Sequence, residues 1–147
     1  MQLTKHTDFA FRTLIYLTMM QEELTTIQKI TDSFGISKSH AMKIVNTLAN
    51  KGWVKSIRGK NGGIKLGCEP QEIKLDEVVS LMENTLDPVN CDQPPCLIAG
   101  ACVLKNELLT AQQAYLDHLA TLSLADLATS RTQQRINNIP IVAKTVS

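Results

Sequence analysis

The sequence predicts a mainly α fold. Three observations support this: two short helical patterns joined by a turn, a glycine-rich hairpin directly after them, and a long apolar stripe beyond a cysteine-rich loop. At 147 residues, 44% of them apolar, the chain can bury one ordinary core. Aromatic residues make up only 4%, so we expect an aliphatic, helical core.

Apolar spacing and capping residues predict three helices in the first third of the chain. The first runs from Asp8 to Met20. Thr25 and Gln28 fit a capping box that opens a second helix, which stops near Gly35. Ser37 caps the third helix, and Gly52 lies where a left-handed residue would end it. The apolar face of this third helix consists of Ala41, Ile44, Val45 and Leu48.

Two short helices with a turn between them are typical of a DNA-binding helix-turn-helix. If the apolar stripe of the third helix faces inward, its polar residues face outward, where they can read base edges or hold phosphates. Any surface helix with outward polar residues has the same pattern, so this alternative stays open. The predicted DNA contacts on this helix are Lys38, Ser39, His40, Lys43 and Asn46.

The next segment is predicted to form a β-hairpin. Residues 53–58 and 64–66 alternate apolar and basic side chains, and the glycine-rich tip lies between them. A hairpin that directly follows a recognition helix is a wing, and Arg58, Lys60 and Asn61 are its predicted DNA contacts. The glycines do not form a phosphate-binding P-loop, because no Gly-Lys-Ser/Thr ending follows them.

Charge is divided unevenly along the chain. Residues 1–67 hold ten basic and four acidic side chains, whereas the remainder holds five basic and ten acidic ones. Residues 37–66 contain seven Lys or Arg and no Asp or Glu, as expected of a surface that faces phosphates, although a solvated basic face would have the same composition. The apolar runs are too short to span a membrane and the N-terminus lacks a signal peptide, which predicts a cytoplasmic protein without a membrane partner.

The second half is predicted to contain a fourth helix around Leu75–Met82, an irregular loop, and a helix of about twenty residues with an apolar stripe from Leu104 to Leu122. Such a helix cannot bury its whole stripe on so small a domain, so we expect it to pair with a second copy in a homodimer. The alternative is packing within one chain. The predicted parts are a winged helix-turn-helix at 1–83, a cysteine loop at 84–102, a dimerisation helix at 103–128 and a flexible tail at 129–147.

Three cysteines in the loop carry the predicted chemistry. Cys91, Cys96 and Cys102 lie within twelve residues, on a proline-bent segment that ends at a helix N-terminus. Their spacing favours an iron–sulfur cluster over zinc, which often uses a Cys-x2-Cys pair that is absent here. A cubane cluster needs a fourth ligand, which a small molecule or another side chain must supply. The candidates in the chain are Cys68, Asp8, His6, His40 and His118.

Four segments in order resemble the winged-helix iron–sulfur regulators, the family that includes the IscR-like proteins, and in particular its nitric-oxide-sensing repressors. They are residues 1–8, residues 37–48, the wing tip 58–63 and the Cys91-x4-Cys96-x5-Cys102 spacing. IscR-like proteins have a histidine just beyond the third cysteine, whereas this chain has Lys105 there. The likeness covers residues 1–127, and Cys68 has no place in the family pattern.

The resemblance implies a homodimer that binds a palindromic operator and responds to nitric oxide. It also implies one 4Fe-4S cluster per subunit, held by Cys91, Cys96 and Cys102 together with Asp8 of the partner subunit. The residues alone favour a different role for Asp8, that of a first-turn carboxylate stabilised by the helix dipole. Two alternatives stay open: an IscR-like regulator that senses iron or cluster supply, and a cluster carrier or electron-transfer protein without specific DNA binding. The scattered histidines form no catalytic set, so no enzyme is predicted.

Overall fold

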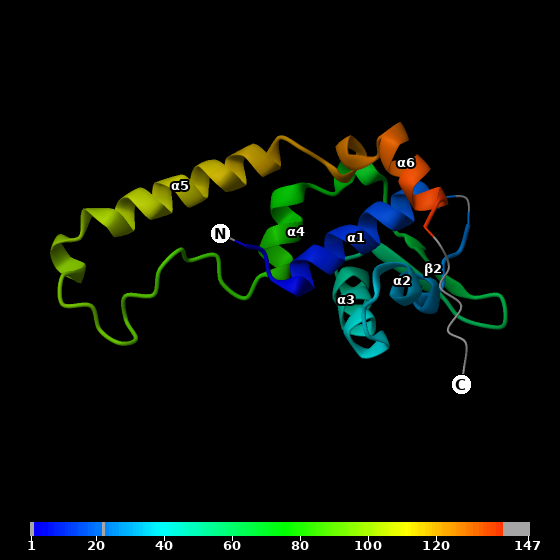
Figure 1. Ribbon diagram of the computed structural model, residues 1–147, viewed down its shortest axis with the longest axis horizontal. Coiled ribbons are helices and arrows are strands. Elements are labelled where there is room, and N and C mark those ends of the chain that lie inside the picture. The colour runs from blue at the N-terminus through cyan, green and yellow to red at the C-terminus, as the bar shows by residue number, and fades with distance from the viewer. Residues whose placement is uncertain (1, 22, 140–147) are drawn as a thin grey trace.

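The computed structural model describes residues 2–21 and 23–139 and is mainly helical, with one two-stranded antiparallel sheet (Figure 1). This arrangement confirms the predicted winged helix-turn-helix class. The helices and strands are α1 (Lys5–Met19), α2 (Ile27–Phe34), α3 (Lys38–Asn50), β1 (Val54–Ile57), β2 (Gly63–Leu66), α4 (Leu75–Met82), α5 (Val103–Ala120) and α6 (Ser130–Asn137). The chain also forms three short 3-10 helices in its described part, η1 (Pro70–Glu72), η2 (Ala99–Ala101) and η3 (Leu124–Leu127).

The helix-turn-helix packs its apolar stripes into one core with α1. The predicted apolar face of α3 is confirmed, because each of its four members is at most 3% exposed. The Ser37 side chain caps α3 by accepting a hydrogen bond from the backbone N–H of His40 at 3.3 Å. Gly35 ends α2 in the left-handed region at φ 65°, which only glycine adopts without strain, so the turn into α3 depends on it.

The predicted N-cap of α2 is wrong by one residue. Thr26 caps the helix and accepts the backbone N–H of Lys29 at 3.1 Å. Thr25 lies just outside the helix, where its backbone N–H donates to the Ile64 carbonyl at 2.9 Å and its carbonyl accepts from Ile64 at 2.7 Å. The segment before α2 therefore binds the wing, a long-range contact that overrides the local capping pattern.

The predicted wing is confirmed as the hairpin of β1 and β2, which pair from Val54 opposite Leu66 to Ile57 opposite Gly63. Its tip requires glycine at two places. Gly59 has φ 114°, and a side chain at position 62 would collide with the Ile57 carbonyl. The tip can therefore carry exposed cationic side chains on a tightly turned backbone.

Helix α5 is held at only one of its ends. Its C-terminal half packs against α4, whereas its N-terminal half projects away from the other helices and carries the cysteine loop (Figure 1). None of its 18 residues is buried, and Val103 and Leu104 are 69% and 62% exposed. One chain therefore leaves much of this helix uncovered.

The expectation of a flexible tail from residue 129 does not hold for the part that the structure describes. Ser130–Asn137 form α6, which Thr129 caps and which packs on α1. Ile136 anchors the helix because its side chain is only 9% exposed and belongs to the core. Residues 140–147 lie outside the described residues.

Candidate DNA-binding surface and cysteine loop

Helix α3 presents polar and basic side chains on the face opposite its buried stripe. Of the predicted DNA contacts, Lys38, Ser39, Lys43 and Asn46 are exposed, and His40 is half-buried. Met42, on the same side, is 45% exposed. The exposed face thus offers hydrogen-bond donors and acceptors beside one apolar contact, as a helix in a major groove requires.

The wing tip adds a second set of exposed basic and amide groups. Arg58, Lys60 and Asn61 are all exposed, as is Lys55 on β1. In Figure 1, α3 and the hairpin lie below α1, and α6 lies above it. Since residues 37–66 carry no acidic side chain, α3 and the wing together form a surface of positive charge that suits a phosphate backbone.

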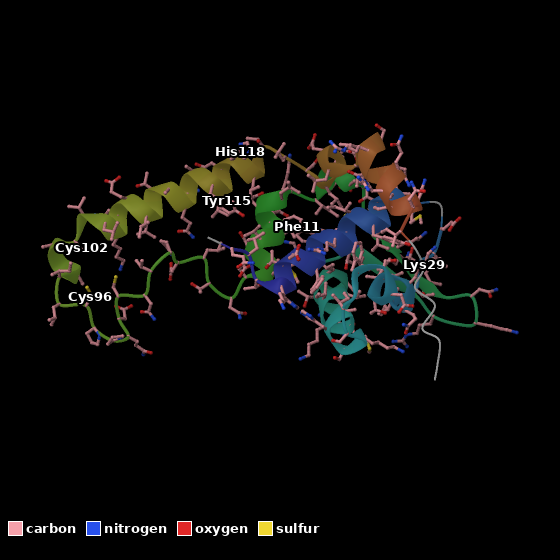
Figure 2. All side chains as sticks on the ribbon, viewed as in Figure 1. Phe11, Lys29, Cys96, Cys102, Tyr115 and His118 are labelled. Carbon is pink, nitrogen blue, oxygen red and sulfur yellow. The ribbon has the colours of Figure 1, made fainter. Side chains whose placement is uncertain are left out.

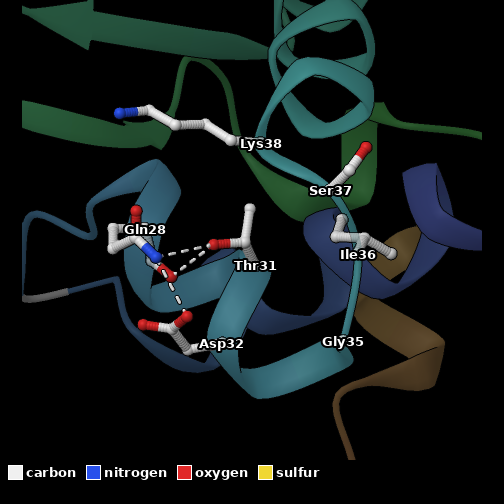
Figure 3. Close-up of a pocket in the computed structure, with 7 residues that line it drawn as sticks. All are labelled: Gln28, Thr31, Asp32, Gly35, Ile36, Ser37 and Lys38. Atoms are coloured by element: carbon white, nitrogen blue, oxygen red, sulfur yellow. Dashed lines mark hydrogen bonds between the residues drawn. The ribbon is translucent and has the colours of Figure 1, made fainter. Parts of the chain in front are cut away.

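A hollow lies at the turn between α2 and α3 and is lined by residues of both helices, among them Gln28 and Lys38 (Figure 3). The Gln28 amide donates to Asp32 Oδ1 at 2.9 Å and to Thr31 Oγ1 at 3.3 Å. These bonds engage the Asp32 carboxylate within α2, beside the basic face. The i,i+4 spacing of Gln28 and Asp32 is the only sign of this set in the sequence.

The first turns of α1 and α3 meet through two histidines. His6 Nδ1 and His40 Nε2 lie 3.2 Å apart, and the rings stack with centroids 5.4 Å apart and planes 12° from parallel. The rings of Phe9 and His40 are perpendicular, with their centroids 5.7 Å apart. Burial and the neighbouring His40 lower the pKa of His6, while Glu83 acts in the opposite direction, and the net shift favours the neutral ring.

Glu83 joins the end of α4 to the start of α1. Its Oε1 accepts hydrogen bonds from Thr7 Oγ1 at 2.5 Å, the Thr4 backbone N–H at 2.9 Å and Thr4 Oγ1 at 3.1 Å. Burial alone would raise the pKa of Glu83, but the bonds from Thr7 and Thr4 outweigh burial and lower it. The chain therefore leaves the helix-turn-helix for the cysteine loop at a residue that is bonded to the first turn of α1.

The cysteine loop keeps its three thiols free and close in sequence. Cys91, Cys96 and Cys102 form no disulfide, Cys96 is exposed, and the other two are half-buried. The Cys96 backbone N–H donates to the Cys91 carbonyl at 3.0 Å and closes the first part of the loop. Cys102 is the N-cap residue of α5, and Figure 2 shows Cys96 and Cys102 at the end of α5 away from α1.

The donor set fits an iron–sulfur centre in kind, since it consists of three free, accessible thiols on irregular backbone. Across residues 2–21 and 23–139, no three His, Cys, Asp or Glu side chains are already grouped to hold a metal ion. Cluster binding would therefore bring the thiols closer together and require a donor from outside the loop.

Two of the proposed fourth ligands have other partners within the chain. Asp8 lies in the first turn of α1 and pairs with Arg12, with Oδ2 to Nη2 at 2.8 Å and Oδ1 to Nε at 2.9 Å. Cys68 packs half-buried against the core, and its pKa is raised by burial and then by Glu72 and Glu69. Because a metal ligand must be a thiolate, Cys68 is poorly suited to that role.

The fold and these surfaces define a winged-helix transcriptional regulator. The chain belongs to the Rrf2 family, whose model, described as an iron-dependent transcriptional regulator, matches residues 3–130. Rrf2 regulators bind DNA and are typically dimeric. None of the helices in the described part of the chain is both long and apolar enough to cross a membrane.

Among solved structures, the chain is similar to CymR of B. subtilis, the global cysteine regulator. The two are 27% identical, with a TM-score of 0.72 over 87% of this chain and 96% of that one. It also resembles IscR of T. potens, at 21% identity and a TM-score of 0.70 over 86% of this chain and 85% of that one. CymR of Staphylococcus aureus in its oxidised form is 21% identical, with a TM-score of 0.71 over 87% and 96% of the two chains. The last two likenesses show the shared fold alone.

Proposed function

We propose that this chain forms a homodimeric repressor that binds a palindromic operator, and that nitric oxide lowers its DNA affinity through an iron–sulfur centre. The observation that carries the proposal is the position of three free thiols on one loop at the start of α5, a helix with no buried residue. A regulator of this kind needs one surface for DNA and one site for a signal. The chain places its basic surface in residues 37–66 and its thiols in residues 91–102.

The proposed ligands are Cys91, Cys96, Cys102 and Asp8 of the partner subunit. A 4Fe-4S cluster, one per subunit, would supply iron that is open to attack by nitric oxide where its ligand is a carboxylate rather than a thiolate. The iron-dependent character of the family model supports the metal. A carboxylate from the partner is supported by the separation between a chain's own α1 and its projecting cysteine loop (Figure 1).

The first turn of α1 provides a route from the loop to DNA. Asp8 binds Arg12 in the structure, so acting as a ligand requires this carboxylate to leave at least one of its two contacts. The first turn of α1 would therefore have two arrangements, one with Asp8 on Arg12 and one with Asp8 on the partner's loop. Since this turn packs on α3 through the two histidines, a change there reaches the recognition helix.

Operator binding by anaerobically purified protein, measured before and after stoichiometric nitric oxide, tests the proposal. We expect iron in the protein and a fall in affinity toward the upper end of about 5- to 150-fold, the range of typical coupling energies. Lys43→Ala is the matched control: it should weaken DNA binding in both states and leave iron content unchanged. Iron-free protein with full operator affinity, or affinity that nitric oxide leaves unchanged, rejects the sensor.

The family description favours one second candidate, a regulator that senses iron or cluster supply. This candidate predicts that a chelator releases the operator as effectively as nitric oxide does. A third possibility, a cluster carrier or electron-transfer protein, predicts reversible reduction without operator selectivity. Replacing Lys43 and Arg58 would leave the function of such a carrier intact.

A further inference from the structure

We propose that His6 is a positioning residue for DNA recognition, because it holds His40 and thereby the first turn of α3 in the orientation that reads DNA. The inference rests only on the DNA-binding part of the proposed function. The 3.2 Å contact between His6 Nδ1 and His40 Nε2 joins residues 34 positions apart in the chain. It is a tertiary contact between the first turns of two helices.

His40 is held on several sides. Its ring stacks on His6 and lies perpendicular to the ring of Phe9, and its backbone N–H donates to Ser37 Oγ. Its sequence neighbours Lys38 and Ser39 are exposed. The N-terminal residues of a recognition helix make its base contacts, so the residue that fixes this turn also fixes the direction from which those side chains approach the bases.

The hydrogen bond also couples the tautomers of the two rings. When one of the two facing nitrogens, His6 Nδ1 or His40 Nε2, carries the proton, the other must be the unprotonated acceptor. Without His6, the tautomer of His40 no longer depends on this partner. A shared metal ion explains the pair less well, since no third ligand group joins it in the described part of the chain.

The test compares His6→Phe, which keeps an aromatic ring without nitrogen, with His6→Asn, which keeps polar atoms close to the position of Nδ1. Operator affinity is measured over a range of salt concentrations, and 15N spectra of the imidazoles report the tautomers. We expect His6→Phe to weaken operator binding by about 2- to 12-fold, the equivalent of one net hydrogen bond. His6→Asn should restore most of the affinity, and Gln71→Ala, an exposed change in η1, should have no effect.

Two further results separate positioning from other roles. The salt dependence of binding should not change in His6→Phe, because His6 neutralises no phosphate. In a His40→Ala background, His6→Phe should have no further effect on affinity, since the two side chains act as a pair. The 15N spectra should show that the His40 tautomer populations change in His6→Phe, because the facing nitrogen is gone.

A smaller salt slope in His6→Phe would overturn the inference, because His6 would then contact the DNA backbone directly. Unchanged affinity in that variant, or additive effects of the two substitutions, would also overturn it. If His6→Phe fails to fold, the operator affinities of His6→Asn and His40→Ala are compared with that of the natural protein instead. Similar affinities for the natural protein and His40→Ala would reject the positioning role of His6. Natural protein that binds no operator contradicts the proposed function. His40 tautomer populations that are the same in the natural protein and in His6→Phe contradict this inference alone.

Discussion

At the residue scale, Glu83 connects two helices that are far apart in sequence. Thr7, whose hydroxyl donates to it, is completely buried, and its hydroxyl also lies 3.2 Å from Thr4 Oγ1. Glu83 also accepts two bonds from Thr4, the N-cap residue of α1. The Glu83 carboxylate thus connects the end of α4 to the start of α1.

Replacing Glu83 by Ala should lower the free energy of unfolding at neutral pH by about 1.5–3 kcal/mol, because the hydrogen bonds that Thr4 and Thr7 donate to this carboxylate are lost. The pKa of this carboxyl is lowered in the folded state, so its contribution is full above the unfolded pKa and is lost as pH falls through the folded value. Urea unfolding should therefore show the gap between natural protein and variant narrowing below about pH 4.3. Glu107→Ala, which removes an exposed carboxylate on α5, is the control. A gap that is constant with pH would contradict this origin.

Variants of Asp8 and Cys68 test which of these two residues is a metal ligand. Asp8→Ala should abolish the iron absorbance of anaerobic protein yet change stability by less than about 1 kcal/mol, since the side chains of Asp8 and Arg12 are 42% and 47% exposed. Cys68→Ala should retain the iron, because burial disfavours its thiolate. Iron that survives in Asp8→Ala and disappears in Cys68→Ala would reverse the ligand assignment.

The sequence predicted His40 as a DNA contact and gave His6 and His40 as candidate ligands, but it did not predict that the two histidines meet. Their contact depends on how α1 crosses α3, which capping and periodicity do not specify. Glu83 was missed for the same reason, since its partners Thr4 and Thr7 are more than 70 positions away. The exposure of Arg58 and Lys60 was predictable because both residues lie in the glycine-rich tip, outside the paired strands of the hairpin.

At the element scale, the turn of the helix-turn-helix depends on one glycine. A side chain added at Gly35 would meet no heavy atom within 4 Å, so the cost of replacing it comes from its backbone conformation alone. Gly35→Ala should destabilise the protein by about 1–2 kcal/mol in thermal or urea unfolding. Gly100→Ala is a matched control, because that glycine also has open space around it but no positive φ. Equal effects of the two changes would refute the role of the turn.

Local patterns predicted α3, α4 and the wing well, because each carries its own cap, stripe or turn residues. They failed where an element depends on distant partners. Thr25 was assigned as a helix cap, but the wing strand engages its backbone. Helix α6 is polar apart from Ile136 and forms against α1, so its sequence alone resembled a tail.

At the scale of the whole molecule, the exposed end of α5 is the predicted dimer interface. Leu104→Glu should convert the dimer to a monomer in sedimentation or light-scattering measurements. The fold should survive, since this side chain is 62% exposed within one chain. Asn106→Glu, an exposed change on the other side of the same helix, should leave the mass unchanged. A dimer that persists in Leu104→Glu would place the interface elsewhere.

The length of α5 predicts how two variant chains behave when they are expressed together. Its 18 residues extend about 27 Å, so the thiols of one chain would meet the N-terminal turn of the other. Coexpression of an Asp8→Ala chain with a chain in which Cys91, Cys96 and Cys102 are serines would then yield heterodimers with one complete donor set and one empty one. Such heterodimers should hold half the natural iron, although neither variant holds any when it is expressed alone. The two defective alleles would thus complement each other.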